Sequence, residues 1–247
     1  MARVAKKKTS VKKQPTKRNF TGAATKVKYK PVKTKRKLGK KASTSNRINK
    51  GISKGISNEL SKILGAQRAK LRPLKQAPPI IENTLRLIAK RLPRANILPG
   101  GSYAKGTSLR GTHDVDVFAR FPRGTPDAKM SEELRVAFPK ATVMHGSRDY
   151  LQLKRGGIVF EIVPVQQVSR PNEIANVTDM SPLHVAYVQK KLSAEQKDDV
   201  RLLKQFCKAA GVYGAESHVR GFSGYVLELL IAQYGTFERF LRTMQKW

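Results

Sequence analysis

The chain has 247 residues, with 50 Lys and Arg against 17 Asp and Glu, and its formal net charge is +33. This excess of positive charge favours a polyanionic partner, because basic surfaces attract phosphate backbones and release their counterions. The single cysteine, Cys207, excludes an intrachain disulfide framework and a cysteine-based zinc site. No apolar run approaches the roughly 18 residues of a membrane span. We therefore expect a cytoplasmic protein with no membrane contact, or a nuclear one if the source is eukaryotic.

The first fifth of the chain is its most basic part. Residues 1–50 contain 19 Lys and Arg and no acid. Such a segment repels itself and has too few large apolar residues to offset its ordering entropy, so we predict a disordered tail over residues 1–55. The tail is expected to bind RNA or DNA, with a solubilising extension as the alternative, and its run KTKRKLGKK is typical of nuclear localisation signals.

Helices and strands are predicted from residue 58 onward. Apolar spacing predicts helices over residues 58–72 and 78–92, and weaker signals predict them over 102–109 and 131–138. Strands are predicted at 97–98 and 115–121, and a hairpin joins 150–153 to 158–165 through two adjacent glycines, which accept the positive φ of its turn. The C-terminal part is helical over 182–192, 195–210, 223–234 and 236–246, with Gly211 and Gly235 as helix stops.

These elements predict an α+β fold in four parts. A disordered basic tail over residues 1–55 is followed by a linker with a helix over residues 56–77. A mixed sheet with flanking helices is predicted over residues 78–170, because strands and helices alternate there. A helical domain is predicted over residues 171–247.

Two aspartates stand out in this basic chain. Asp114 and Asp116 lie two residues apart in the run THDVDVF, so both share one face of the strand while Val115 and Val117 share the other. Paired carboxylates repel each other, and burying them costs several kcal/mol unless a cation intervenes. A two-metal site uses such a pair to hold divalent ions about 3.5–4 Å apart. The alternative is a partly exposed strand end.

Two further features support a site around this pair. Gly100-Gly101-Ser102 precedes a predicted helix, where backbone N–H groups favour a phosphate. Glu161 is an isolated charge in the apolar run VFEIV. It either completes a three-carboxylate metal site or faces solvent on an edge strand. The sequence thus predicts a phosphate site and a metal site that face one cleft.

These motifs resemble a known family. Gly101-Ser102, an Asp-x-Asp pair about a dozen residues later and an acid within a later strand resemble the nucleotidyltransferases of the DNA polymerase β superfamily. The closer resemblance is to the amino-terminal catalytic and central domains of archaeal-type (class I) CCA-adding tRNA nucleotidyltransferases. It covers about residues 78–247 and is carried by GGSYAKGTSLRGTHDVDVFARFP, FEIVPV, TDMSPLHVAYV and, above all, DDVRLLKQFCKAAGVYGAESHVRGFSGYVLELLIAQYGTF.

The resemblance implies a fold, a reaction and a set of site residues. It implies a polymerase β-like domain that adds CMP and AMP from CTP and ATP to the 3′ end of tRNA and releases pyrophosphate. Asp114, Asp116 and Glu161 would be the catalytic acids and would hold two Mg²⁺ ions. The residues implied in nucleotide binding are Gly101, Ser102, Lys105, Ser181, His184, Lys204 and Tyr213, with Arg220 as a further basic candidate.

Without the resemblance, three of these residues have ordinary interpretations. Lys204 would be a surface lysine of a helix, Tyr213 a core aromatic residue with a solvated hydroxyl, and His184 a helix residue without a special role.

The chain also departs from the family pattern. Glu161 stands where aspartate is usual, Lys105 where arginine is usual, and Met180 replaces an arginine. The family continues beyond the point that corresponds to Trp247, with two more domains that hold the acceptor stem and the T-loop region of tRNA. We expect that the chain adds CMP and AMP either alone or with a second polypeptide that supplies these domains; the alternative is a different RNA-terminal transferase.

Two alternatives come from other functional classes. An RNA-binding or chaperone-like protein with a diverged nucleotidyltransferase fold would explain the basic tail, but not the three carboxylates. A second-messenger synthase resembling oligoadenylate synthetases would share Gly-Ser and Asp-x-Asp, but it would not predict the runs GVYGAE and VRGFSGY.

Overall fold

A computed structural model describes residues 45–73 and 78–246 of the chain. The chain divides into two units, Met1–Arg47 and Ile48–Trp247, and the second contains every element discussed below apart from the first residues of α1. Most of the predicted basic tail, residues 1–44, lies outside the described residues.

Helix α1 is longer than predicted. It spans Ser45–Leu71, whereas the helix was predicted over residues 58–72. Its first residues therefore lie in the segment 1–55, which we predicted as disordered, and that prediction is wrong for residues 45–55. Gly51 and Gly55 weaken the helical signal there, because glycine costs about 1 kcal/mol relative to alanine in a helix interior.

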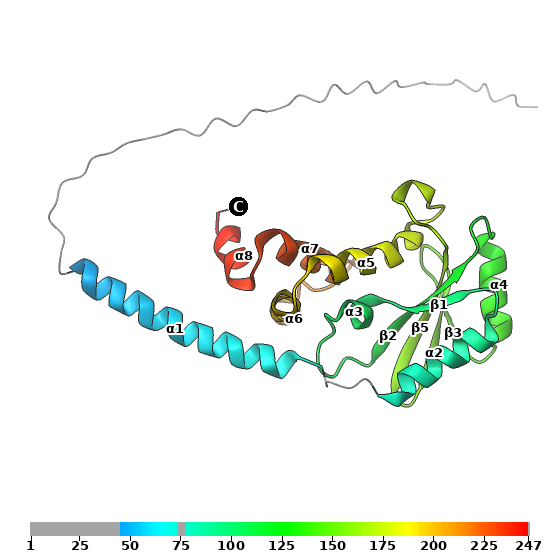
Figure 1. The fold of residues 1–247 in the computed structure, drawn as a ribbon, viewed down its shortest axis with the longest axis horizontal. Coiled ribbons are helices and arrows are strands. Elements are labelled where there is room, and N and C mark those ends of the chain that lie inside the picture. The colour runs from blue at the N-terminus through cyan, green and yellow to red at the C-terminus, as the bar shows by residue number, and fades with distance from the viewer. Residues whose placement is uncertain (1–44, 74–77, 247) are drawn as a thin grey trace, which may run out of the picture. The chain divides into compact units, whose positions relative to one another are not determined.

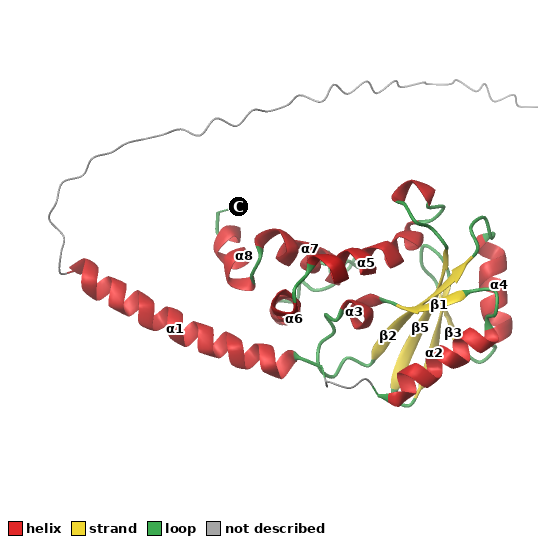
Figure 2. Ribbon diagram, in the orientation of Figure 1, coloured by secondary structure: helices red, strands yellow, loops and turns green. Residues whose placement is uncertain are grey.

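The strands form one mixed sheet, as predicted (Figure 1, Figure 2). Its members are β1 (Asn96–Pro99), β2 (Asp114–Phe121), β3 (Thr142–Met144), β4 (Tyr150–Arg155) and β5 (Ile158–Gln166), in the order β1-β2-β5-β4-β3. Only the β2–β5 pair is parallel. Strand β3 was not predicted, because three residues at a sheet edge carry no periodic signal. The alternative that placed Glu161 on an edge strand is wrong, since β5 lies between β2 and β4.

The predicted hairpin is confirmed. Strands β4 and β5 pair antiparallel, with Arg155 opposite Ile158. Between them Gly156 and Gly157 have φ values of +55° and +76°, a conformation that residues with a side chain rarely adopt.

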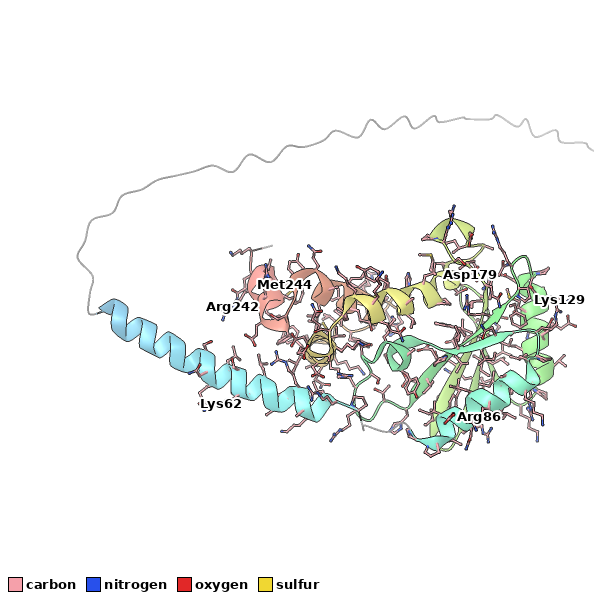
Figure 3. All side chains as sticks on the ribbon, viewed as in Figure 1. Lys62, Arg86, Lys129, Asp179, Arg242 and Met244 are labelled. Carbon is pink, nitrogen blue, oxygen red and sulfur yellow. The ribbon has the colours of Figure 1, made fainter. Side chains whose placement is uncertain are left out.

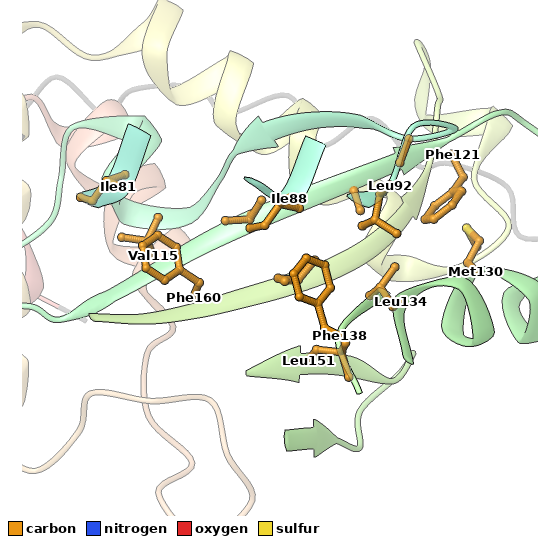
Figure 4. Close-up of a cluster of buried hydrophobic side chains, with 14 of the residues drawn as sticks. Ile81, Ile88, Leu92, Val115, Phe121, Met130, Leu134, Phe138, Leu151 and Phe160 are labelled. Atoms are coloured by element: carbon orange, nitrogen blue, oxygen red, sulfur yellow. The ribbon is translucent and has the colours of Figure 1, made fainter. Parts of the chain in front are cut away.

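The two faces of the sheet have different surroundings. On one face Val115, Phe121 and Phe160 pack in the main hydrophobic core with α2 (Pro79–Arg91) and α4 (Asp127–Ala137), as Figure 4 shows. On the other face Phe118 and Val165 pack against Val185 of helix α5 (Ser181–Lys191). Because side chains alternate along a strand, the carboxylates of β2 and β5 lie on this second face.

Two short helices differ from their predicted limits. Helix α3 spans only Gly101–Lys105, where residues 102–109 were predicted, because Gly106 takes a left-handed φ of +69° and ends it. Helix α4 begins at Asp127 rather than residue 131, directly after Pro126.

The C-terminal part is helical, as predicted. Two 3₁₀ turns, η1 (Pro171–Glu173) and η2 (Val177–Met180), lead from the sheet into α5, and they are followed by α6 (Ala194–Ala209), α7 (Gly224–Tyr234) and α8 (Phe237–Met244). Gly211 and Gly235 follow α6 and α7 with φ values of +69° and +90°. The division at residue 170 stays a prediction, because Ile48–Trp247 forms one unit.

A second hydrophobic core holds the helices together. Leu64 of α1 is buried in it with residues of α5 to α8. Arg68 of α1 reinforces this packing, since its Nη2 lies 2.7 Å from Oδ1 of Asp199 on α6. Among residues 45–73 and 78–246, no helix has both the length and the hydropathy needed to cross a bilayer.

Helix α4 offers a test of the main core. Leu134 is 1% exposed, whereas Val136, two residues later, is 76% exposed. Leu134→Ala should lower the free energy of unfolding by about 2–5 kcal/mol, because it leaves a cavity. Val136→Ala should change it by less than about 0.5 kcal/mol. Urea unfolding measures both, and similar losses would contradict this placement of the core.

Candidate active site

The parallel pairing of β2 with β5 brings two carboxylates together. Asp116 lies directly opposite Glu161 in the register, and Asp114 lies two residues earlier on the same face of β2. Oε1 of Glu161 accepts a hydrogen bond of 2.8 Å from Nε2 of Gln152 on β4, which orients the glutamate. All three predicted catalytic acids therefore share one sheet face.

Gly101 is fitted closely to Asp116. The backbone N–H of Gly100 donates to the Asp116 carbonyl at 2.7 Å, which holds the start of α3 against β2. Gly101 has a φ of +53°, and a methyl group built on it would lie 1.5 Å from Oδ2 of Asp116. Only glycine satisfies both the backbone conformation and this close approach.

The acidic face is electrostatically strained. The pKa of Asp116 is raised from 3.8 to about 6, first by burial and then by the negative charges of Glu161 and Asp114. Lys105 opposes this rise with its positive charge. A carboxylate in this setting is stabilised by any cation that approaches it.

The donor set suits a divalent cation, although the side chains are not gathered around a common point. Hard ions such as Mg²⁺ prefer carboxylate oxygens, which Asp114, Asp116 and Glu161 provide. In the described part of the chain, no three His, Cys, Asp or Glu side chains are close enough together to form a metal site. The residues therefore fit a metal by chemistry and by sheet face, and its coordination stays a prediction.

A cavity of about 390 Å³ opens beside these carboxylates. The predicted site residues that line it are Gly101, Lys105, Asp116, Glu161, Ser181 and His184. Ser102, Lys204 and Tyr213 are not among its lining residues, and Asp114 lines a separate, larger and mainly apolar cavity of about 1220 Å³. The structure thus brings six of the predicted residues to one cavity.

Helices α5 and α7 contribute an aromatic pair to the cavity. His184 stacks on Tyr225 of α7, with ring centroids 4.0 Å apart and an interplanar angle of 15°. The pKa of His184 is lowered by burial and by Lys105, against the effect of Glu228. The stacking holds the imidazole of His184 at the cavity, and its role in nucleotide binding stays a prediction.

A buried polar cluster lies behind the cavity. Lys105 and Lys204 share the carboxylate of Glu228, with Nζ to oxygen distances of 2.8 and 3.5 Å. Nζ of Lys204 also donates to the carbonyl and hydroxyl oxygens of Thr107, both at 3.1 Å. The interpretation of Lys204 as a surface lysine is therefore wrong, since its side chain is 3% exposed.

Tyr213 lies close to this cluster. A methyl group built on Gly224 would lie 3.2 Å from the Tyr213 hydroxyl and 3.5 Å from Cε of Lys204, so both side chains reach the start of α7. Burial is the main cause of the raised pKa of Tyr213. Arg220, the further basic candidate, is exposed, and its Nε donates to the carbonyl of Ser217.

Sequence reasoning missed a buried ion pair beside the cavity. Asp179, labelled in Figure 3 in the segment between β5 and α5, is fully buried. Its Oδ1 accepts hydrogen bonds from Nη1 of Arg148 at 2.6 Å and from the backbone of Gln166 at 2.8 Å. Arg148 also pairs with Asp127 at 2.8 Å. These contacts fix the start of α5, and thus Ser181 and His184, against the sheet.

Comparison with known proteins assigns the two parts of the chain. A nucleotidyltransferase domain model matches residues 81–184, and a model of the second domain of tRNA nucleotidyltransferases matches residues 198–247. Residues 81–184 are a nucleotidyltransferase domain. The expected resemblance to tRNA nucleotidyltransferases is confirmed over these two segments.

Curated relatives agree with this assignment of the nucleotidyltransferase domain. The chain is 34% identical over 183 residues to the CCA-adding enzyme of Saccharolobus shibatae, which covers 72% of this chain and 44% of that protein. It is 38% identical over 155 residues to the CCA-adding enzyme of Methanothermobacter thermautotrophicus, and this alignment covers 60% of this chain and 34% of that protein. The chain therefore spans less than half the length of these relatives.

Solved structures confirm the fold around the nucleotidyltransferase domain. A cytoplasmic RNA terminal U-transferase matches with a TM-score of 0.54 and 17% identity, over 72% of this chain and 53% of that one. Cid1, an RNA terminal uridylyl transferase, matches with a TM-score of 0.55 and 15% identity, over 70% of this chain. At this identity the likeness concerns the fold alone.

Gly101 and Gly111 form a matched pair for testing the contact with Asp116. Both have positive φ, but a methyl group on Gly111 would meet nothing within 4 Å. Gly111→Ala should lower the free energy of unfolding by about 1–2 kcal/mol, the usual backbone strain. Gly101→Ala should lower it further, because the Asp116 side chain must move. Urea unfolding measures both variants. Equal losses of the free energy of unfolding would contradict the close contact between Gly101 and Asp116.

The raised pKa of Asp116 predicts a pH-dependent effect on stability. The Asp116 carboxyl has a pKa of about 6 in the folded state and 3.8 in the unfolded state. Its ionisation therefore destabilises the folded state increasingly as the pH rises from 3.8 to about 6. Asp116→Asn should therefore raise the free energy of unfolding at pH 8 by on the order of 2 kcal/mol, and by nothing at pH 3.5.

The measurement is urea unfolding in metal-free buffer across this pH range. Glu82→Gln is the control, because Glu82 is an α2 carboxylate whose side chain is 69% exposed. An Asp116→Asn gain that did not depend on pH would contradict the proposed cause.

Proposed function

We propose that this chain is a metal-dependent RNA nucleotidyltransferase that transfers CMP and AMP from CTP and ATP to the 3′ end of tRNA. The observation that carries the proposal is the pairing of Asp116 with Glu161 beside a cavity that Gly101 and Lys105 also line. This arrangement lies inside a nucleotidyltransferase domain, and the curated relatives quoted above are CCA-adding enzymes.

Asp114, Asp116 and Glu161 are proposed to hold two Mg²⁺ ions. The raised pKa of Asp116 and the three carboxylates that share one sheet face support this assignment. When bound, such ions lower the pKa of an attacking hydroxyl and offset the charge of a leaving pyrophosphate.

In the reaction, the 3′-oxygen of the RNA bonds to the α-phosphorus of the nucleotide. The bond from that phosphorus to the bridging oxygen of the β-phosphate breaks, and pyrophosphate leaves with the electron pair. Glu161, which Gln152 orients, is proposed to accept the proton of the 3′-hydroxyl. The contribution of the protein is then mainly positioning and charge stabilisation.

The triphosphate is proposed to lie between the acidic sheet face and the basic cluster. Lys105 is the cation that both lines the cavity and acts on Asp116. Gly101 leaves room for the phosphates to approach the backbone, and Ser102 adds a hydroxyl group. Ser181 and His184 lie at the start of α5. Lys204 and Tyr213 lie behind Lys105.

The partners follow from charge and from the relatives. Nineteen Lys and Arg without an acid in residues 1–50 would add affinity for RNA, and would make it salt-dependent. The curated relatives are more than twice as long as the matched region, so we propose that further polypeptide, in the same chain or a separate one, completes tRNA recognition. The buried free Cys207 suits a reducing compartment such as the cytoplasm.

Asp116→Ala tests the reaction. Incorporation of labelled CMP into tRNA that lacks its CCA end should fall at least about a hundredfold, because a metal ligand is lost. Binding of the same tRNA should change little, since Asp116 does not contribute positive charge. Filter binding and gel analysis of labelled tRNA measure the two effects.

The wild-type chain without Mg²⁺ and the surface variant Glu82→Ala serve as controls. The first should be inactive and the second should match the wild type. Full activity of Asp116→Ala would overturn the metal assignment. Tight tRNA binding by a wild type that incorporates no nucleotide would instead favour an RNA-binding protein.

A further inference from the structure

Glu228 on α7 is the centre of the buried cluster, although no sequence motif pointed to it. It is 1% exposed. Its Oε2 lies 2.8 Å from Nζ of Lys105, and its Oε1 accepts a hydrogen bond of 2.6 Å from the hydroxyl of Thr107. Lys204 on α6 completes the cluster at 3.5 Å. One carboxylate therefore joins the catalytic sheet domain, through α3 and the residues after it, to two helices of the C-terminal part.

The charges in this cluster do not balance. Two ammonium groups share one carboxylate, so one positive charge remains in a setting where the side chains of Lys105 and Lys204 are 10% and 3% exposed. Lys105 also interacts with the charge of Asp116, but within the cluster itself one buried positive charge stays unpaired, which favours an added anion. Of the two lysines only Lys105 lines the cavity, so the excess charge is available to a ligand there.

The same face of α7 orients Lys105 from a second direction. Tyr225 lies three residues before Glu228, and residues with this spacing are neighbours on a helix surface. Nζ of Lys105 lies 4.9 Å from the centroid of the Tyr225 ring, within cation–π range. The ring is itself held by stacking on His184. Lys105 is thus fixed between a carboxylate and an aromatic ring.

We propose that Glu228 is a positioning residue for the nucleotide: it pairs with Lys204 and holds Lys105 at the cavity, where the ammonium group meets the triphosphate. The inference rests on the proposed function, and it adds to it a residue that contacts neither substrate nor metal. Glu228 would act through the two lysines, while Thr107 holds the carboxylate in place.

The electrostatics of Lys204 support this role. Burial is the largest influence on the pKa of Lys204 and lowers it, while the charge of Glu228 raises it. Loss of the Glu228 charge would therefore let Lys204 lose its proton at a lower pH. The charged or titratable groups that face the two lysines from neighbouring elements are Asp116 of β2, His184 of α5, Arg201 of α6, Tyr225 and Glu228 of α7, and Tyr213.

Glu228→Gln is the main test, because it keeps the size of the side chain and removes the charge. CTP binding is measured by calorimetry between pH 7 and 9.5, above the pKa values of Asp116 and His184. Near pH 7 the affinity should lie within about threefold of wild type. At pH 9.5 the loss should be larger, about tenfold, because without the Glu228 charge Lys204 loses its proton at a lower pH. The kcat for CMP incorporation should fall at least about tenfold at both pH values, since Lys105 loses a charged hydrogen-bond partner.

Two further variants separate positioning from general damage to the fold. Glu82→Gln removes the same charge from an exposed site on α2 and should leave all readouts unchanged. Thr107→Val keeps the shape and the charge of the cluster but removes the hydroxyl that donates to Glu228 and accepts from Lys204. It should lower kcat by about threefold to tenfold with the wild-type pH dependence, and it remains informative if Glu228→Gln does not fold.

Each outcome bears on the inference. Weaker CTP binding by the same factor at every pH would mean that Glu228 is only structural, and wild-type behaviour of Glu228→Gln would also overturn its role. If the wild type binds CTP but transfers nothing to tRNA, the proposed function fails while the binding test of Glu228 still holds. If the wild type does not bind CTP, both fail.

Discussion

The parallel pairing of β2 with β5 is the constraint on which the site depends. Its register sets Asp116 opposite Glu161, and the alternation of side chains sends Val115 and Phe160 into the core on the opposite face. A slip of one residue would bury the carboxylates and expose the core side chains. The hydrophobic core that stabilises the sheet therefore also specifies which face carries the acids, so the fold and the proposed active site depend on the same contacts.

The site separates opposite charges across a small cavity. Three carboxylates lie on the sheet face, where burial first, and then the charges of Glu161 and Asp114, raise the pKa of Asp116. Behind the cavity, Lys105 and Lys204 outnumber the carboxylate of Glu228. Neither side is electrostatically satisfied alone. The proposed ligand, a metal-bound triphosphate, carries both kinds of charge, cationic towards the carboxylates and anionic towards the lysines, and would therefore suit this arrangement better than a simple cation or anion.

Local sequence signals predicted the elements and the motif residues well, but not their partners. The turn at Gly156 and Gly157, the helix stops at Gly211 and Gly235, and the shared face of Asp114 and Asp116 all follow from spacing within a few residues. In the local sequence Glu228 is one acid in an apolar helix and Arg148 is one basic residue in a basic chain, so nothing nearby distinguishes either residue. Their roles depend on partners 123 residues away for Glu228 and 31 residues away for Arg148, and periodicity carries no information on such contacts.

The sequence by itself determined the chemistry available to this protein: a pair of aspartates on one strand face, a glycine turn beside them, and family motifs that the comparisons later matched. Only the tertiary structure decided that Glu161 lies on a central strand beside Asp116, that Lys204 is buried, and that Glu228 joins the two lysines. The physical reason is that residue type and short-range spacing act along the chain. Burial and charge pairing, by contrast, are properties of surfaces that meet only after the chain has folded.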